Sequence, residues 1–254
     1  MYRLWAIEGD ENIKKILSFF TADDCMVIEP DIDQYRELKL RLLNGTHTLS
    51  CGIAFLSGID SVKNAMDNKT MEAYISGVMK KEIGPSIPYD IDNSVIQDFI
   101  AKVLDRFRNP HINHHWKNIT LNYSSKMKMR CVPLLVNYYK KNDTAPELFA
   151  LGFAAYLYFM KPVRQIGNEY FGECNGQEYL IEDEMAGEFH KMWMNQTTDK
   201  LVEVVLKNAL LWEQDLSMLP GFRQSVSDKL NTIINKGMRG AIENIYPGKS
   251  MCDE

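Results

Sequence analysis

The chain has 254 residues, 45% of them hydrophobic and 25% charged, with a formal net charge of −5. Lysines and arginines are interspersed with acids and form no stripe, which excludes the electrostatic surface of a nucleic-acid-binding protein. Five cysteines without a C-x-x-C pair exclude a disulfide framework and a thiolate zinc site, so we expect a globular cytoplasmic protein with reduced thiols that binds a small molecule or a protein partner.

Strand signals come first along the chain and are short. Apolar runs at residues 4–7 and 25–28 predict two strands. Helical periodicity then takes over, and Asp31 or Asp33 is expected to cap a long helix. This helix continues to just before Gly58, where a glycine can end it.

Helix signals dominate the middle of the chain. Residues 92–94 offer caps for a helix with an apolar face over residues 95–104. Proline is tolerated at the first helical position, so Asn109-Pro110 predicts another helix start. Thr144 and Glu147 have the spacing of a capping box and predict a third.

The last part of the chain is also mainly helical. Residues 148–160 are apolar on every side, which is typical of a helix at the centre of a bundle, and the run is shorter than the roughly 20 residues that span a bilayer. Amphipathic helices are predicted at residues 198–216 and 222–234, and a hairpin around Asn175-Gly176. The predicted class is mainly α, with a short β-containing N-terminal entry.

The segment from Lys39 to His47 carries the most informative polar residues. On a regular α-helix, at about 100° per residue, Lys39, Asn44 and His47 fall within roughly 140° of arc and can share a cleft. An amine, an amide and an imidazole suit proton transfer, oxyanion binding and contact with a hydroxyl. Neighbouring leucines are expected to shield Lys39 from water. From spacing alone, a solvated lysine and a structural core histidine remain the alternative.

The pattern K-x-x-x-x-N-x-x-H, met by Lys39, Asn44 and His47, resembles the signature of the mannitol dehydrogenase family of polyol-specific long-chain dehydrogenases. The resemblance extends over nearly the whole chain. The sequence around the motif is similar to that of family members that act on hexuronates. The further segments and positions that carry it are residues 4–8, 54–62 and 106–110, then His114, Asn122, Lys126, Arg130 and Pro133.

This resemblance implies a fold and a set of roles. Residues 31–254 would form the helical C-terminal domain of these enzymes, of the 6-phosphogluconate dehydrogenase type, and residues 1–30 the end of a nucleotide-binding domain. Lys39 would be the general acid/base, Asn44 would hold the oxyanion and His47 would contact substrate hydroxyls. The substrate would be a hexuronate or polyol, and the cofactor would be NAD, bound mainly by a Rossmann domain in cis or in trans.

The chain departs from the family in its phosphate-binding loops. No G-x-G-x-x-G follows a strand and no G-x-x-x-x-G-K-[ST] occurs, so no residue of this chain is predicted to bind the cofactor. The chain alone is therefore expected to be inactive. A monomer is expected because no strong unpaired apolar helix face stands out, and the choice between NAD and NADP stays open because the selecting residue follows the glycine loop. Other substrates of the family, or a non-catalytic helical interaction module, are the alternatives.

A hexuronate carries a carboxylate, which an arginine can bind with two hydrogen bonds. The candidate substrate-binding residues are Arg106, Arg108, His114, Lys126 and Arg130. Solvated faces or salt bridges within the domain explain the cations among them equally well. His111, His114 and His115 have helical spacing, but no carboxylate or thiolate lies nearby in sequence and the family chemistry is metal-independent, so no metal is predicted.

Overall fold

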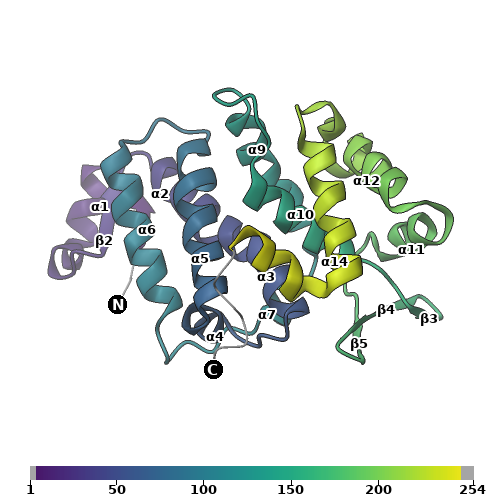
Figure 1. The fold of residues 1–254 in the computed structure, drawn as a ribbon. Helices are drawn as coiled ribbons and strands as arrows, with labels where there is room; N and C mark the ends of the chain where they lie inside the picture. Colours follow the sequence, from purple (N-terminus) through teal and green to yellow (C-terminus); the bar gives the residue numbers. More distant parts are fainter. Residues whose placement is uncertain (1–3, 247–254) are drawn as a thin grey trace.

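Helices account for most of residues 4–246, the part of the chain that the computed structural model describes (Figure 1). The α-helices are α1 (Glu11–Ile16), α2 (Asp33–Leu38), α3 (Thr46–Leu56), α4 (Val62–Asp67), α5 (Lys69–Gly77), α6 (Asn93–Phe107), α7 (Trp116–Ile119), α8 (Tyr123–Lys126), α9 (Val132–Tyr138), α10 (Glu147–Phe159), α11 (Ala186–Asn195), α12 (Thr198–Lys207), α13 (Ala209–Trp212) and α14 (Phe222–Ile245). The mainly α class is confirmed.

Shorter elements interrupt this set. The π-helical segments are η2 (Lys39–Gly45), η3 (Val78–Ile83) and η5 (Met127–Cys131), and the 3-10 turns are η1 (Ser18–Ala22), η4 (Gly84–Ser86) and η6 (Leu216–Met218). The strands are β1 (Trp5–Glu8), β2 (Met26–Glu29), β3 (Arg164–Ile166), β4 (Glu169–Cys174) and β5 (Gln177–Leu180). Within residues 4–246, no helix combines the length and apolarity needed to cross a membrane.

Helix α10 is the centre of the helical body, as its all-round apolar sequence predicts. Every residue from Leu148 to Leu157 is buried, and the helix packs against α3 and α14 (Figure 1). The α3–α10 contact is close because of Gly152, where an added Cβ would lie only 2.8 Å from Leu49 Cδ2. The apolar run is therefore the core helix of a bundle.

The N-terminus of α10 is capped differently from the prediction. Pro146 precedes the first helical residue, Glu147, and the Thr144 side chain makes no cap. Instead, Glu82 from η3 accepts hydrogen bonds from the backbone N–H of Leu148 at 3.0 Å and of Phe149 at 2.7 Å. The capping box was wrong because the helix begins only at Glu147, and the distant Glu82 carboxylate takes the place of the Thr144 hydroxyl.

The short strands form two separate sheets. β1 and β2 are parallel, from Trp5↔Met26 to Glu8↔Glu29, and lie with α1 at one end of the molecule, whereas β3, β4 and β5 lie at the other (Figure 1). The predicted hairpin is confirmed: Cys174 pairs with Gln177 across Asn175 and Gly176. Both turn residues have positive φ, 53° and 75°, as a tight two-residue hairpin requires.

Other helix ends agree only in part with the sequence. Asp92 caps α6 by accepting from the N–H of Ser94 at 2.7 Å, as predicted. The helix start at Asn109-Pro110 was wrong: residues 109–115 form a loop, in which the Asn109 side chain accepts from the N–H of His111. The helix expected over residues 198–216 breaks at Asn208, whose side chain caps α13.

The long helix that was expected before Gly58 is three elements. Ile32, and neither aspartate, occupies the cap of α2, while Asp31 accepts from the N–H of Asp33 at 2.7 Å. The segment η2 then separates α2 from α3, which ends at Leu56, and Gly58 follows with φ of 78°. The π turn carries Lys39 and Asn44, two of the candidate residues.

Candidate active site

Lys39 and Asn44 share a π-helical turn. The sequence places them on a regular α-helix, roughly 140° apart. The structure differs, because η2 spans Lys39–Gly45 and π-helical hydrogen bonds join residues five positions apart. Since five positions separate Lys39 from Asn44, the π turn brings both residues onto the same face of the segment. Such turns are frequent at functional sites.

The side chains of Lys39 and Asn44 are not used by the fold. Lys39 is exposed and Asn44 is half-buried, and neither side chain bonds to another residue between positions 4 and 246. The expected shielding of Lys39 by leucines was wrong, because Leu38 and Leu42 are themselves buried in the core. A free amine and a free amide therefore stand together at the surface.

His47 lies in the first turn of α3 and is buried. Its ring stacks on Phe107, with 4.4 Å between centroids and 6° between planes, and meets Trp116 edge-on at 5.9 Å. Its Nε2 is buried and has no hydrogen-bond partner within the described residues, so a hydroxyl group that reached this atom would supply the missing bond. Burial, and then the charges of nearby cations, lowers the pKa of His47 to about 3, so the imidazole is neutral at physiological pH.

Four of the five candidate substrate-binding residues, all except Arg108, interact electrostatically with His47 or with one another. His114, Arg130 and Arg106 act electrostatically on His47, and the ring of His114 lies 5.9 Å from it. Burial and then the charge of Arg130 lower the pKa of Lys126. Arg106 is half-buried and has no ion pair within residues 4–246. Arg106, Lys126 and Arg130, called the positive cluster below, supply charge that suits a carboxylate, whereas burial and then Arg106 lower the pKa of His114.

The remaining candidates belong elsewhere. Arg108 pairs with Glu72 at 3.0 Å on the surface, so it is held away from the cluster. The helical spacing of His111, His114 and His115 does not exist, because they lie in the loop before α7. No group of three histidine, cysteine or acidic side chains in the described chain could hold a metal ion.

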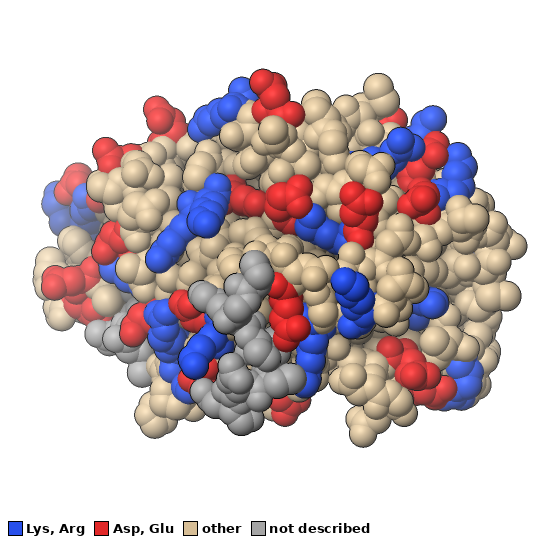
Figure 2. All heavy atoms as spheres, viewed as in Figure 1, with Lys and Arg blue, Asp and Glu red and all other residues tan. Residues whose placement is uncertain are grey.

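Acidic and basic side chains are interspersed over the face seen in Figure 2.

A pocket of about 220 Å³ opens beside His47. Its walls include side chains that the sequence reading did not select, Asn113, His115 and Asn118, together with His114. Amides and neutral imidazoles can both donate to and accept from hydroxyl groups. The sequence gives little sign that Asn113, His115 and Asn118 line a pocket, because the pocket depends on a loop that was predicted to be helical.

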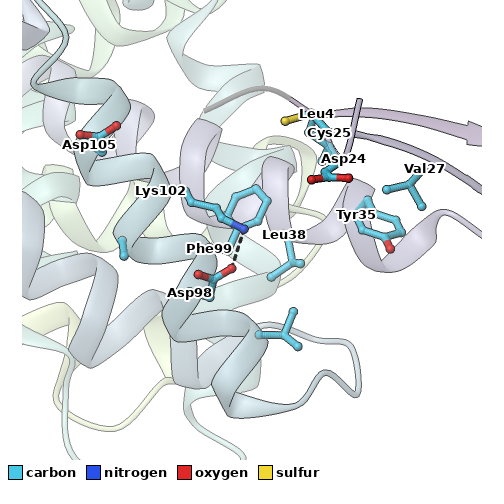
Figure 3. Close-up of a pocket in the computed structure, with 12 residues that line it drawn as sticks. Leu4, Asp24, Cys25, Val27, Tyr35, Leu38, Asp98, Phe99, Lys102 and Asp105 are labelled. Atoms are coloured by element: carbon cyan, nitrogen blue, oxygen red, sulfur yellow. Dashed lines mark ion pairs between the residues drawn. The ribbon is translucent and has the colours of Figure 1, made fainter. Parts of the chain in front are cut away.

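A second pocket, of about 540 Å³, lies between the N-terminal strands and α6 (Figure 3). Leu4 and Cys25, near the starts of β1 and β2, line it together with Leu38, and Lys102 is turned towards Asp98 at 2.6 Å. Ligands of parallel sheets bind beyond the carboxyl ends of the strands. This pocket is at the amino ends, and none of the three motif residues lines it.

The glycine-containing turn from β1 into α1 does not fit a pyrophosphate. β1 leads through Gly9 into α1, but the Asp10 carboxylate already accepts from the N–H groups of Asn12 and Ile13. A carboxylate at this position would repel a phosphate. The dinucleotide phosphates therefore have no place on this turn.

Known proteins are similar to the chain over most of its length. A sequence profile of the mannitol dehydrogenase C-terminal domain matches residues 31–234. Altronate oxidoreductase of Escherichia coli (strain K12) is 32% identical over 248 residues, which cover 95% of this chain and 49% of that protein. The enzyme of the same name from Pectobacterium carotovorum is 32% identical over 254 residues, or 50% of its length. The chain thus spans about half the length of the curated relatives it matches.

Solved structures show the same fold. Pseudomonas fluorescens mannitol 2-dehydrogenase, in a ternary complex with NAD and D-mannitol, superposes with a TM-score of 0.73 at 21% identity, over 89% of this chain and 43% of that one. A substrate-free D-sorbitol dehydrogenase gives a TM-score of 0.56 at 15% identity, over 85% and 42% of the two chains.

Proposed function

The chain belongs to the family of mannitol dehydrogenase C-terminal domains, and from this premise we propose that it is the substrate-binding and proton-transferring half of an NAD-dependent tagaturonate reductase, or altronate oxidoreductase. The observation that carries the proposal is the π turn. It brings the unpaired Lys39 and Asn44 onto one face, next to the helix that holds the neutral His47. The substrate is inferred from the altronate oxidoreductases that the chain resembles.

Each residue then has a chemical task. In reduction, Lys39 Nζ donates a proton to the oxygen of the substrate carbonyl, and in oxidation it accepts the hydroxyl proton. Asn44 donates N–H to the oxygen while negative charge develops on it. His47, which burial keeps neutral, orients a substrate hydroxyl, and the adjoining amide-lined pocket accommodates others. The redox step belongs to NAD, which another domain would bind.

The carboxylate of the sugar acid is assigned to the positive cluster. Arg106 is the first choice because its guanidinium has no ion pair within the described chain, whereas one N–H of Arg130 already donates to Thr48 Oγ1 at 3.2 Å. Lys126 donates to the Ile119 carbonyl at 3.0 Å. Arg106 and Arg130 therefore supply the forks, and Lys126 adds charge.

The N-terminal strands indicate where a dinucleotide-binding domain would join, in cis or in trans. Parallel sheets are normally covered on both faces and built from several strands. Here β1 and β2 pair only with each other within residues 4–246, and Trp5 of β1 and Phe19 of η1 are 56% and 52% exposed. We assign residues 1–30 to the end of that domain, with β1 and β2 at the edge of its sheet.

The four described cysteines are free thiols, which suits the cytoplasm. Cys252 lies outside the described residues.

The proposal is tested by dehydrogenase assays with altronate and NAD, and with tagaturonate and NADH. The chain is assayed alone and after mixing with the separately expressed dinucleotide-binding domain of the Escherichia coli enzyme. We expect turnover only in the mixture. Faster turnover with fructuronate or fructose would overturn the substrate, and no turnover from two folded components would favour a non-catalytic helical module.

Replacing Arg106 with alanine tests the carboxylate site. Loss of a charge-assisted hydrogen-bonding partner costs about 1.5–3 kcal/mol, so KM for altronate should rise by roughly 10- to 150-fold. Steady-state kinetics of the assembled enzyme measure this. The matched control is Arg108→Ala, because that guanidinium pairs with Glu72 and should leave KM within about twofold. Equal effects of the two substitutions would contradict the assignment.

A further inference from the structure

Arg41 is a buried charge inside the π turn that carries Lys39 and Asn44. Only 7% of the residue is exposed, so its guanidinium must find partners within the protein. Its Nε donates to Glu37 Oε2 at 2.9 Å, one turn earlier. Two further bonds leave the segment altogether and connect it with another part of the chain.

The distant partners of Arg41 lie in a second π turn. Arg41 Nη1 donates to the carbonyl oxygen of Met129 at 2.8 Å and to that of Arg130 at 3.1 Å. Both residues belong to η5, which directly follows the helix that ends at Lys126. One guanidinium therefore joins the turn that carries the proposed acid/base to the turn that carries a proposed carboxylate ligand.

The two turns also approach each other closely. At Gly45, the last residue of η2, an added Cβ would lie 3.8 Å from the Arg130 carbonyl oxygen and 3.5 Å from Leu134 Cδ1. Arg130 Nη1 donates in turn to Thr48 Oγ1 on α3. Arg41 is thus the charged centre of a packed contact between η2 and η5, beneath the surface where substrate would lie.

We propose that Arg41 is a positioning residue that fixes the separation between Lys39 and the side chain of Arg130. This inference rests on the proposed function. A sugar acid carries its carboxylate and its reacting carbonyl on one carbon chain, so an enzyme must meet both at a fixed distance. If η2 slides against η5, either the carboxylate or the reacting oxygen is displaced. Displacement of about 1 Å can cost about 100-fold in rate.

Lysine cannot replace arginine in this contact. The guanidinium offers a rigid planar fork that reaches Glu37 and both carbonyls at once, whereas an ammonium group is a compact point charge. Arg41→Lys therefore keeps the charge and loses the geometry. The matched control is Arg36→Lys on α2, because the Arg36 side chain is 60% exposed and, among residues 4–246, pairs only with the local Asp33.

The test has two readouts. In the assembled enzyme, Arg41→Lys should lower kcat for altronate by about 100-fold, with a smaller change in KM, while Arg36→Lys keeps both. In the chain alone, amide hydrogen exchange should speed up together in residues 39–45 and 127–131 and stay slow in α10. Unchanged kcat or unchanged exchange in Arg41→Lys would overturn the proposal, as would a fall in thermal stability with normal kcat in the folded fraction. An inactive wild-type assembly would instead count against the proposed function.

Discussion

Replacing Lys39 with methionine should lower kcat of the assembled enzyme for altronate by about 10²- to 10⁴-fold, the range that positioned acid/base groups contribute. Methionine keeps the length of the side chain and removes the exchangeable proton. Because Lys39 is exposed and makes no bond within residues 4–246, the fold should lose almost no stability. Steady-state turnover and thermal unfolding, measured on the same preparations, separate the two effects.

Two companion variants make this prediction specific. Lys63→Met removes a surface lysine that pairs with Asp67, and it should leave kcat unchanged. Lys39→Arg keeps the positive charge, but an arginine does not release its proton in proteins, so it should be nearly as damaging as methionine. Turnover of Lys39→Met within tenfold of wild type would rule out Lys39 as the acid/base.

Replacing Glu82 with alanine should lower the free energy of unfolding by about 2–6 kcal/mol, the largest loss of stability among these variants. Its carboxylate accepts from two buried backbone N–H groups at the start of α10, and each group left unpaired costs about 1–3 kcal/mol. Urea unfolding measures the loss. Glu147→Ala is the control at the same helix end, because the Glu147 side chain is 61% exposed and should cost below about 1 kcal/mol. Similar losses from both would contradict the cap.

The same carboxyl group should make stability depend on pH. Burial raises the pKa of Glu82 from 4.5 to about 7, although the two N–H groups act in the opposite direction. The folded state therefore holds a proton that the unfolded state releases between about pH 4.5 and 7, and stability falls as pH rises through this window. Glu82→Gln should flatten that slope.

The sequence predicted elements whose causes are local. The apolar residues around α10 made its central place readable, and Asn175-Gly176 specified a tight turn through its backbone preferences. The sequence did not predict the cap of α10, because Glu82 is 66 residues away from Leu148 along the chain. The sequence likewise predicted a regular α-helix through residues 39–45. The structure has a π turn there, which packs against η5.

The candidate site likewise contains residues that the sequence predicted and residues that it did not. Lys39, Asn44 and His47 were selected from spacing and family resemblance, and the structure sets the first two on one π turn and the third in the first turn of the helix that follows. Asn113 and Asn118 were missed because their pocket is made by a loop and by its contact with α3, neither of which leaves a periodic signal. Arg41 was missed because its partners lie 88 and 89 residues away.

The π turn makes the number of residues in this segment part of the chemistry. Such a turn commonly holds one residue more than the α-helix it interrupts. If the seven residues from Lys39 to Gly45 formed a regular α-helix, Lys39 and Asn44 would be roughly 140° apart and the shared face would be lost. Deleting Leu40 would instead place the two residues four positions apart, about 40° on a regular helix, so the shared face would be kept without a π turn. Five positions from the lysine to the asparagine therefore require the π turn, whereas four would require a regular helix.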